Sequence, residues 1–259
     1  MNNENNNILD QRIREYLAQN GIAELSREEV KNKIECLSGM DFLELKNRFQ
    51  VHELPDFYEI GQSGRDNYNY RIAFLKWMVN FIDSYPIGDC SILDSGCATG
   101  LDLCFLAGHY KDRDKIFKGY DKQEGMIFLA KEKAKRLSLK NVEFYVSDHD
   151  LDIVNPDSSE ICSVDVLYNN NSLGLPEMRA ENKTEAVEEI DRVQASRIAN
   201  VLSRVKSGGT GIIGGVYTGK VDSLLPRLEN RGIVYVRGEK IFNTPLGLEY
   251  FNQVFEIHR

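Results

Sequence analysis

The sequence lacks a pair of cysteines at metal-binding spacing. Its five cysteines are spread over 259 residues, and no two of them form a C-x-x-C pair. Cys90, Cys97 and Cys104 are equally spaced, but we expect them to lie before a strand, in a turn and inside a helix, where they share no face. We therefore expect no metal site and no disulfide. Buried free thiols fit a reducing compartment such as the cytoplasm.

A long hydrophobic run is also missing. The most apolar patch, Phe74 to Ile82, is too short to cross a bilayer and contains Lys76, and the first seven residues are polar, unlike a signal peptide. Positive charge is not in excess, since the chain has 32 Lys and Arg residues and 40 Asp and Glu residues. An acidic chain gains no general attraction to phosphate backbones. These absences argue against membrane and nucleic-acid partners, and the composition is typical of a globular soluble protein.

The most informative segment that is present runs from Ser91 to Gly100. An apolar pair is followed by Asp94, and a helical apolar pattern begins at Leu101, so the segment predicts a strand, a tight turn and a helix. Small residues occupy every second position of the turn: Gly96, Ala98 and Gly100. They let a ligand lie against the backbone, and a helix start offers free N–H groups with a partial positive charge. We therefore predict a nucleotide-type cofactor site.

The spacing of this turn distinguishes between cofactors. In the dinucleotide fingerprint G-x-G-x-x-G, the third glycine allows close packing of helix on strand. Leu101 occupies that position here, which counts against a nicotinamide-dependent oxidoreductase. The pattern Leu-Asp-x-Gly-Cys-x-x-Gly instead resembles the first motif of class I S-adenosylmethionine-dependent methyltransferases. That family usually has glycine where this chain has Ala98.

Strands and helices alternate after the turn. A long helix is predicted from Thr184 to Lys206, ended by Ser207-Gly208-Gly209. The predicted strands are Phe117–Tyr120, Val142–Val146, Val164–Tyr168, Gly211–Val216, Ile233–Val236 and Tyr250–Ile257. This alternation predicts an α/β fold with a mostly parallel sheet and helices on both faces. The family resemblance covers roughly Cys90 to the C-terminus and implies a Rossmann-like sheet that ends in a C-terminal antiparallel hairpin.

Residues 1–89 are predicted to form a helical region separate from a methyltransferase domain at residues 90–259. Ser26-Arg-Glu-Glu29 has the pattern of a capping box, Glu53 to Asn69 predicts a loop, and Tyr70 to Ile82 predicts a helix. In the resembling family such regions often form a lid over the cofactor. The candidate substrate contacts from this lid are Tyr58, Tyr68 and Tyr70, with simple packing of helices on the sheet as the alternative.

Ligands in open α/β sheets bind beyond the carboxyl ends of the strands. Asp121 follows a predicted strand and could accept hydrogen bonds from both ribose hydroxyls, or cap the next helix. The resemblance implies that Asp148 accepts a hydrogen bond from the adenine amino group. Asp94 could orient the turn or lie near the methionine amino group. The candidate cofactor contacts are Asp94, Gly96, Cys97, Ala98, Gly100, Asp121, Lys122, Asp148, His149 and Asn169.

His149 is the candidate general base, because histidine titrates near neutrality, with a surface loop position as the alternative. Asn170 and Asn171 are candidate substrate contacts after the predicted strand that ends at Tyr168. Some amino-methylating relatives carry Asn-Pro-Pro-Tyr here. This chain lacks the prolines and the aromatic residue, which argues against base or protein-glutamine methylation of that kind.

The sequence therefore predicts an S-adenosylmethionine-dependent enzyme that transfers a methyl group directly to a small-molecule acceptor, mainly by alignment and exclusion of water. A cofactor-binding regulatory or partner module without turnover is one alternative. A protein methyltransferase is another.

Overall fold

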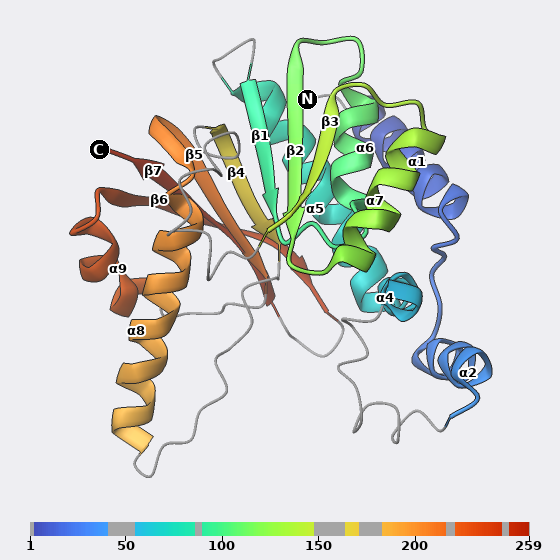
Figure 1. Cartoon of the computed structure of the whole chain (residues 1–259), viewed down its shortest axis with the longest axis horizontal. Helices are drawn as coiled ribbons and strands as arrows, with labels where there is room; N and C mark the ends of the chain where they lie inside the picture. The colour runs from blue at the N-terminus through green and yellow to red at the C-terminus, as the bar shows by residue number, and fades with distance from the viewer. Residues whose placement is uncertain are drawn as a thin grey trace.

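Strands of one mixed sheet form the centre of the computed structural model, which describes residues 3–40, 55–85, 90–147, 164–170, 183–215, 221–244 and 249–258. The strands are β1 (Cys90–Ser95), β2 (Lys115–Asp121), β3 (Val142–Val146), β4 (Val164–Asn170), β5 (Val205–Gly215), β6 (Ile233–Asn243) and β7 (Glu249–Ile257). Their order is β3-β2-β1-β4-β5-β7-β6, as Figure 1 shows. β7 runs antiparallel to β5 and β6, and the other neighbouring strands are parallel. The predicted α/β sheet with a C-terminal antiparallel pair is confirmed.

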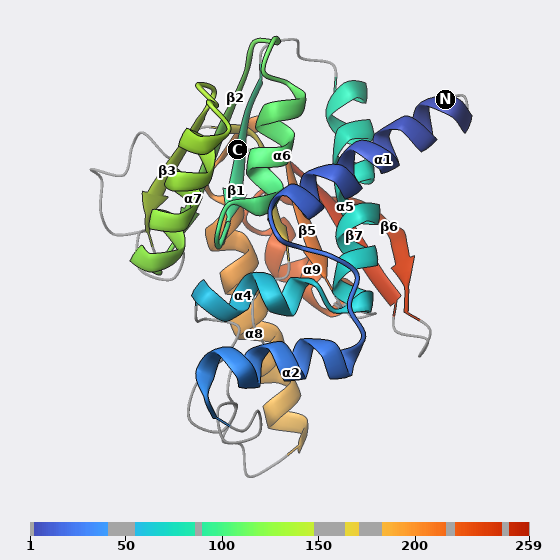
Figure 2. The same cartoon turned by 90° about the vertical axis from the view of Figure 1, so that its right-hand side faces the viewer.

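Helices cover both faces of this sheet. One face carries α5 (Arg65–Ser84), α6 (Leu101–His109) and α7 (Glu124–Arg136), and the other carries α8 (Lys183–Leu202) and α9 (Val221–Glu229) (Figures 1 and 2). We call them the α5 face and the α8 face. Successive strand residues alternate between them: Ile92, Val166 and Ile212 enter the α5-face core, whereas Leu93, Leu167 and Ile213 enter the α8-face core. None of the helices within the described ranges is both long and apolar enough to cross a bilayer.

Three helices precede α5: α1 (Asn3–Gln19), α2 (Arg27–Ser38) and α4 (Pro55–Gln62). The capping box is confirmed, since the Glu29 N–H donates to Ser26 Oγ at 3.3 Å and the Ser26 N–H donates to Glu29 Oε2 at 2.7 Å. Helix α1 packs on α5, and its Tyr16 hydroxyl donates to the Leu101 carbonyl oxygen at 2.7 Å. The first helix of the chain is therefore fixed to the start of α6.

Two predicted boundaries are wrong. The described part of the predicted loop from Glu53 to Asn69 is mostly helical, because it contains α4 and the start of α5. Pro55 begins α4, where its missing N–H would have had no helical partner. Helix α8 ends at Leu202, and Val205 already pairs with Val164 in the sheet.

The glycines thought to end that helix serve strand pairing instead. A Cβ at Gly209 would lie 2.6 Å from the Asp165 carbonyl oxygen. Glycine at this position therefore lets β5 approach β4 closely.

Candidate active site

The turn between β1 and α6 adopts a left-handed backbone conformation at three of its small residues. Gly96, Ala98 and Gly100 have φ values of +79°, +46° and +67°. Glycine enters this left-handed region at little cost, whereas the methyl group of Ala98 makes it strained. A Cβ at Gly100 would lie 2.8 Å from the Phe144 ring and 2.9 Å from the Ala130 Cβ. Helix α6 can therefore begin where it does only because residue 100 has no side chain. The predicted strand, turn and helix are confirmed.

Asp121 fastens this turn to the end of β2. Its Oδ2 accepts a hydrogen bond from the Ala98 N–H, and its Oδ1 accepts one from the Gln123 N–H, both at 3.0 Å. The side chain is half-buried, and each carboxylate oxygen keeps a lone pair for a further donor. Asp121 thus supports the turn and the start of α7, and its carboxylate can still accept further hydrogen bonds.

The other candidate cofactor contacts differ in their surroundings. Asp94 is buried and accepts a hydrogen bond from the Tyr168 hydroxyl at 2.9 Å. Burial, with a contribution from the nearby Asp102 carboxylate, holds the pKa of Asp94 well above its usual range. Burial likewise raises the pKa of the Cys97 thiol well above its ordinary value, so this thiol stays protonated. Lys122 is exposed. Asp148, His149 and Asn171 lie outside the described residues.

Asn169 joins β4 to β1 on the α8 face. Its Nδ2 donates to the Ser95 carbonyl oxygen at 2.7 Å and to Ser95 Oγ at 3.2 Å. The Tyr120 hydroxyl shares a 2.5 Å hydrogen bond with Ser95 Oγ and accepts one from Arg204 at 2.8 Å. Because strand side chains alternate, Asn169 and Asn170 point to opposite faces.

A buried ion pair that the sequence analysis missed lies beside the turn. Arg71 on α5 donates to Asp102 Oδ1 on α6 at 2.5 Å, and both side chains are under one-tenth exposed. Arg71 also donates to Gln62 of α4 at 2.8 Å, and its Nε has no hydrogen-bond partner within the part of the chain that the structure describes. Burial opposes protonation of Arg71, but the Asp102 carboxylate raises its pKa, so the guanidinium stays charged. The only sequence feature that could have indicated this ion pair is an arginine on the buried side of a predicted helix.

Tyr70 and Asn170 connect this ion pair to the end of β4. The Tyr70 hydroxyl donates to Asn170 Oδ1 at 2.5 Å, and Asn170 Nδ2 donates to Asp102 Oδ2 at 3.3 Å. Burial raises the pKa of Tyr70 far above its usual range, so the hydroxyl keeps its proton. The Tyr70 ring also contacts Tyr250 of β7, with 4.3 Å between ring centroids. Two candidate substrate contacts thus meet at the carboxyl edge of the sheet.

The remaining candidate tyrosines lie in different places. Tyr58 on α4 is half-buried; burial raises its pKa, and Arg71 and Asp102 act on it electrostatically. Tyr68 is buried, and the guanidinium carbon of Arg14 on α1 lies 5.8 Å from its ring centroid. Tyr58 therefore joins the cluster around Arg71, whereas Tyr68 faces α1.

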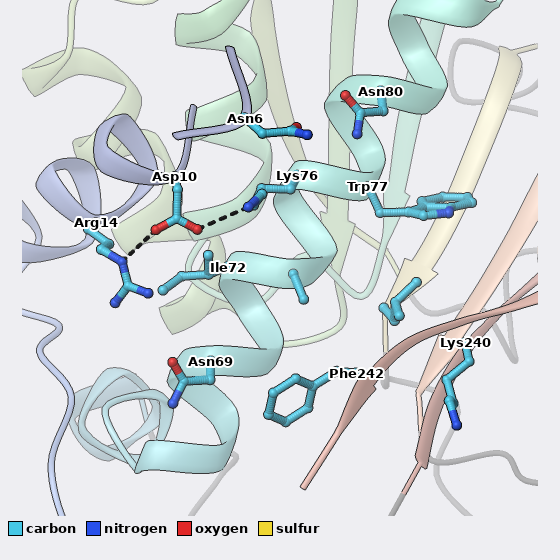
Figure 3. Close-up of a pocket in the computed structure, with 12 residues that line it drawn as sticks. Asn6, Asp10, Arg14, Asn69, Ile72, Lys76, Trp77, Asn80, Lys240 and Phe242 are labelled. Carbon is cyan, nitrogen blue, oxygen red and sulfur yellow. Dashed lines mark hydrogen bonds and ion pairs between the residues drawn. The ribbon is translucent and has the colours of Figure 1, made fainter. Parts of the chain in front are cut away.

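A groove lies between α1, α5 and β6 (Figure 3). Its charged residues neutralise one another: Asp10 accepts from Arg14 at 2.7 Å and from Lys76 at 3.1 Å. Lys240 pairs with Glu249 at 2.7 Å. The groove contains none of the candidate site residues.

Residues 88–210 match the family model described as a methyltransferase domain. The match includes the turn, Asp121 and β4. This part of the chain is similar to methyltransferase domains, and the match spans a little under half of the chain. The protein is accordingly an S-adenosylmethionine-dependent enzyme. No curated protein sequence matches the chain.

Solved structures give the same fold. N-methyltransferase NodS from Bradyrhizobium japonicum is 14% identical with a TM-score of 0.52, over 75% of this chain and 99% of that one. Magnesium protoporphyrin IX methyltransferase from Synechocystis is 13% identical with a TM-score of 0.51, over 74% and 82%. TrmN from Thermus thermophilus is 16% identical with a TM-score of 0.50, over 72% and 48%. At these identities the similarity establishes the fold and leaves the acceptor open.

Proposed function

We propose that the chain methylates a small-molecule acceptor. The observation that carries this proposal is the buried polar cluster beside the cofactor turn, which brings together Tyr70, Arg71, Asp102 and Asn170 from α5, α6 and β4. These side chains are largely covered by the protein, and a site built from buried polar groups suits a small molecule better than a polymer. The net charge of −8 also disfavours a nucleic-acid acceptor.

The residues present fit S-adenosylmethionine, which supplies an electrophilic methyl group. We assign the ribose hydroxyls to Asp121, and we assign the adenine amino group to Asp148, as the family resemblance implies. The methionine end carries one carboxylate and one ammonium group. Arg71, with its unpartnered Nε, suits the carboxylate, and Asp94 suits the ammonium group.

We further propose that residues 1–89 act as a lid on the domain at residues 90–259. Lys133 of α7 donates to Glu59 of α4 at 2.5 Å and to Thr99 of the turn at 3.4 Å. The lid helix and the cofactor turn therefore share one buried cation. Closure of the lid would exclude water while the acceptor is held in line for transfer. His149 stays the candidate base. The cysteines in the described ranges are free thiols, which supports a cytoplasmic location.

Calorimetry tests the cofactor assignment. We expect S-adenosylmethionine and S-adenosylhomocysteine to bind and NAD not to bind. Asp121→Ala should weaken binding by roughly tenfold to a few hundredfold, since hydrogen bonds to a charged group are worth about 1.5–3 kcal/mol. The control is Asp112→Asn, at an exposed position away from the turn, which should bind like the wild type. Binding of NAD without binding of either sulfur cofactor would refute the assignment.

A further inference from the structure

An asparagine without hydrogen-bond partners lies near Tyr70 and Asn170. Asn252 on β7 has no exposed surface, and neither its Nδ2 nor its Oδ1 has a partner within the described residues. Buried carboxamides in native proteins are nearly always paired, because an unpaired one has lost its hydration without compensation. The position therefore requires an explanation beyond packing.

The register of the sheet places Asn252 in a row with Asn170. Asn170 lies opposite Gly214 across β4 and β5, and Gly214 lies opposite Asn252 across β5 and β7. Residues paired in this way point to the same face. A Cβ at residue 214 would lie 2.8 Å from Asn252 Oδ1, 3.4 Å from Asn170 Oδ1 and 3.5 Å from the Tyr70 hydroxyl. Three oxygens thus converge above Gly214, at the edge of the sheet where ligands bind.

The hydrogen bonds around Asn170 show which hydrogen-bond partners are missing above Gly214. Asn170 Nδ2 faces the Asp102 carboxylate, which can only accept, so Asn170 Oδ1 must be the atom near Tyr70. The single hydroxyl hydrogen of Tyr70 is already donated to that oxygen. Each carboxamide oxygen nevertheless keeps a free lone pair. The two carboxamide oxygens therefore leave room for two donor hydrogens from a ligand, and Asn252 Nδ2 leaves room for one acceptor.

We propose that Asn170 and Asn252 recognise the acceptor and that the methylated group is a neutral primary amine, an inference that rests on the proposed function. An –NH₂ group donates one hydrogen to each oxygen and keeps its lone pair free, whereas a hydroxyl has one hydrogen and leaves one oxygen unpaired. In the transfer, the nitrogen lone pair forms the new N–C bond while the S–C bond breaks with its electrons left on sulfur. The product is a secondary ammonium that carries the charge of the former sulfonium, so the transfer step itself requires no base, and His149 would act only on an acceptor that arrives as ammonium.

Thermal unfolding of Asn252→Leu is the first test. Leucine has the same number and branching of side-chain heavy atoms and no polar atom. If the carboxamide serves a ligand, its removal relieves an unpaired buried group, and the midpoint should rise by about 2–4 °C. A lower midpoint would show that Asn252 stabilises the fold and would overturn the inference.

The second test is calorimetry on the protein loaded with S-adenosylhomocysteine. The probes are primary amines from methylamine to benzylamine and their matched alcohols, in alkaline buffer. In the wild type we expect at least one amine to bind about tenfold more tightly than its alcohol. Asn252→Leu and Gly214→Ala should remove this preference, the second by filling the space. Gln253→Leu, which changes the next residue on the opposite face of β7, should keep it.

Equal binding of amines and alcohols, or no binding of either, would overturn the assignment of a nitrogen acceptor. Failure of S-adenosylhomocysteine itself to bind would instead overturn the proposed function. The two failures are therefore distinguishable in the same experiment.

Discussion

Ala98 holds a methyl group in a backbone conformation that glycine adopts freely, with φ at +46°. A β-branched side chain should be tolerated less well there. We expect Ala98→Val to lower the free energy of unfolding by on the order of 1–3 kcal/mol. Ala98→Gly should stay within about 1 kcal/mol of the wild type, because relief of strain is offset by a more flexible unfolded chain. Urea denaturation measures both. A valine variant as stable as the wild type would show that the turn relaxes.

Gly100 is constrained by space as well as by φ. Its missing Cβ would contact Phe144 and Ala130 below 3.0 Å, so Gly100→Ala should cost about 1–3 kcal/mol of stability and weaken cofactor binding. The matched control is Gly108→Ala inside α6, where the nearest atom to an added Cβ is a Leu139 methyl carbon at 3.7 Å. That variant should be neutral or slightly stabilising. Equal losses in the two variants would contradict the steric argument.

Strand β4 depends on a charged residue that joins it to both of its neighbours. Asp165 accepts hydrogen bonds from the Ser91 N–H at 2.9 Å and from Ser91 Oγ at 2.8 Å on β1, and it pairs with Lys206 on β5. Burial alone would raise the pKa of Asp165, but the hydrogen bonds from Lys206 and Ser91 lower it below its ordinary value. The ionised form therefore stabilises the fold above the unfolded pKa of about 3.9.

Asp165→Asn should accordingly destabilise the protein by about 1–3 kcal/mol at neutral pH. The difference from the wild type should shrink as the pH falls below about 4, because the wild-type carboxylate then becomes protonated. Unfolding curves over a pH series measure this. A difference that persists unchanged at low pH would show that shape rather than charge matters at this position.

Elements were predictable where local pattern and tertiary structure agree. Val142–Val146 is a strand at the predicted residues, because alternating apolar side chains fit a half-buried strand. Helix α4 was missed because Pro55 and Gly61 usually mark loops, although proline suits a first helical position. The cofactor turn was found because it is contiguous in sequence. Arg71 and Asn252 were missed, since their significance depends on partners from distant segments.

At the scale of the whole molecule, the lid and the cofactor turn should respond together. We expect S-adenosylhomocysteine to slow hydrogen exchange in residues 55–70 as well as in residues 96–100, because Lys133 joins Glu59 to Thr99. Residues 233–243 of β6, at the far edge of the sheet, provide the internal control. Protection confined to the turn and Asp121 would show that the N-terminal helices are not a lid, and acceptor selection would then come from the sheet-side residues alone.

The position of β7 has a consequence for how each molecule matures. This strand lies between β5 and β6, yet it is synthesised after every other described strand. Until it inserts, β5 and β6 present unpaired edges, and neither Tyr250 nor Asn252 is in place. Asp121 and the glycine turn belong to β1, β2 and their connections, which are made much earlier. A nascent chain would therefore complete the segment with the glycine turn and Asp121 first. It could bind the methyl donor before β7 is in place to contact an acceptor.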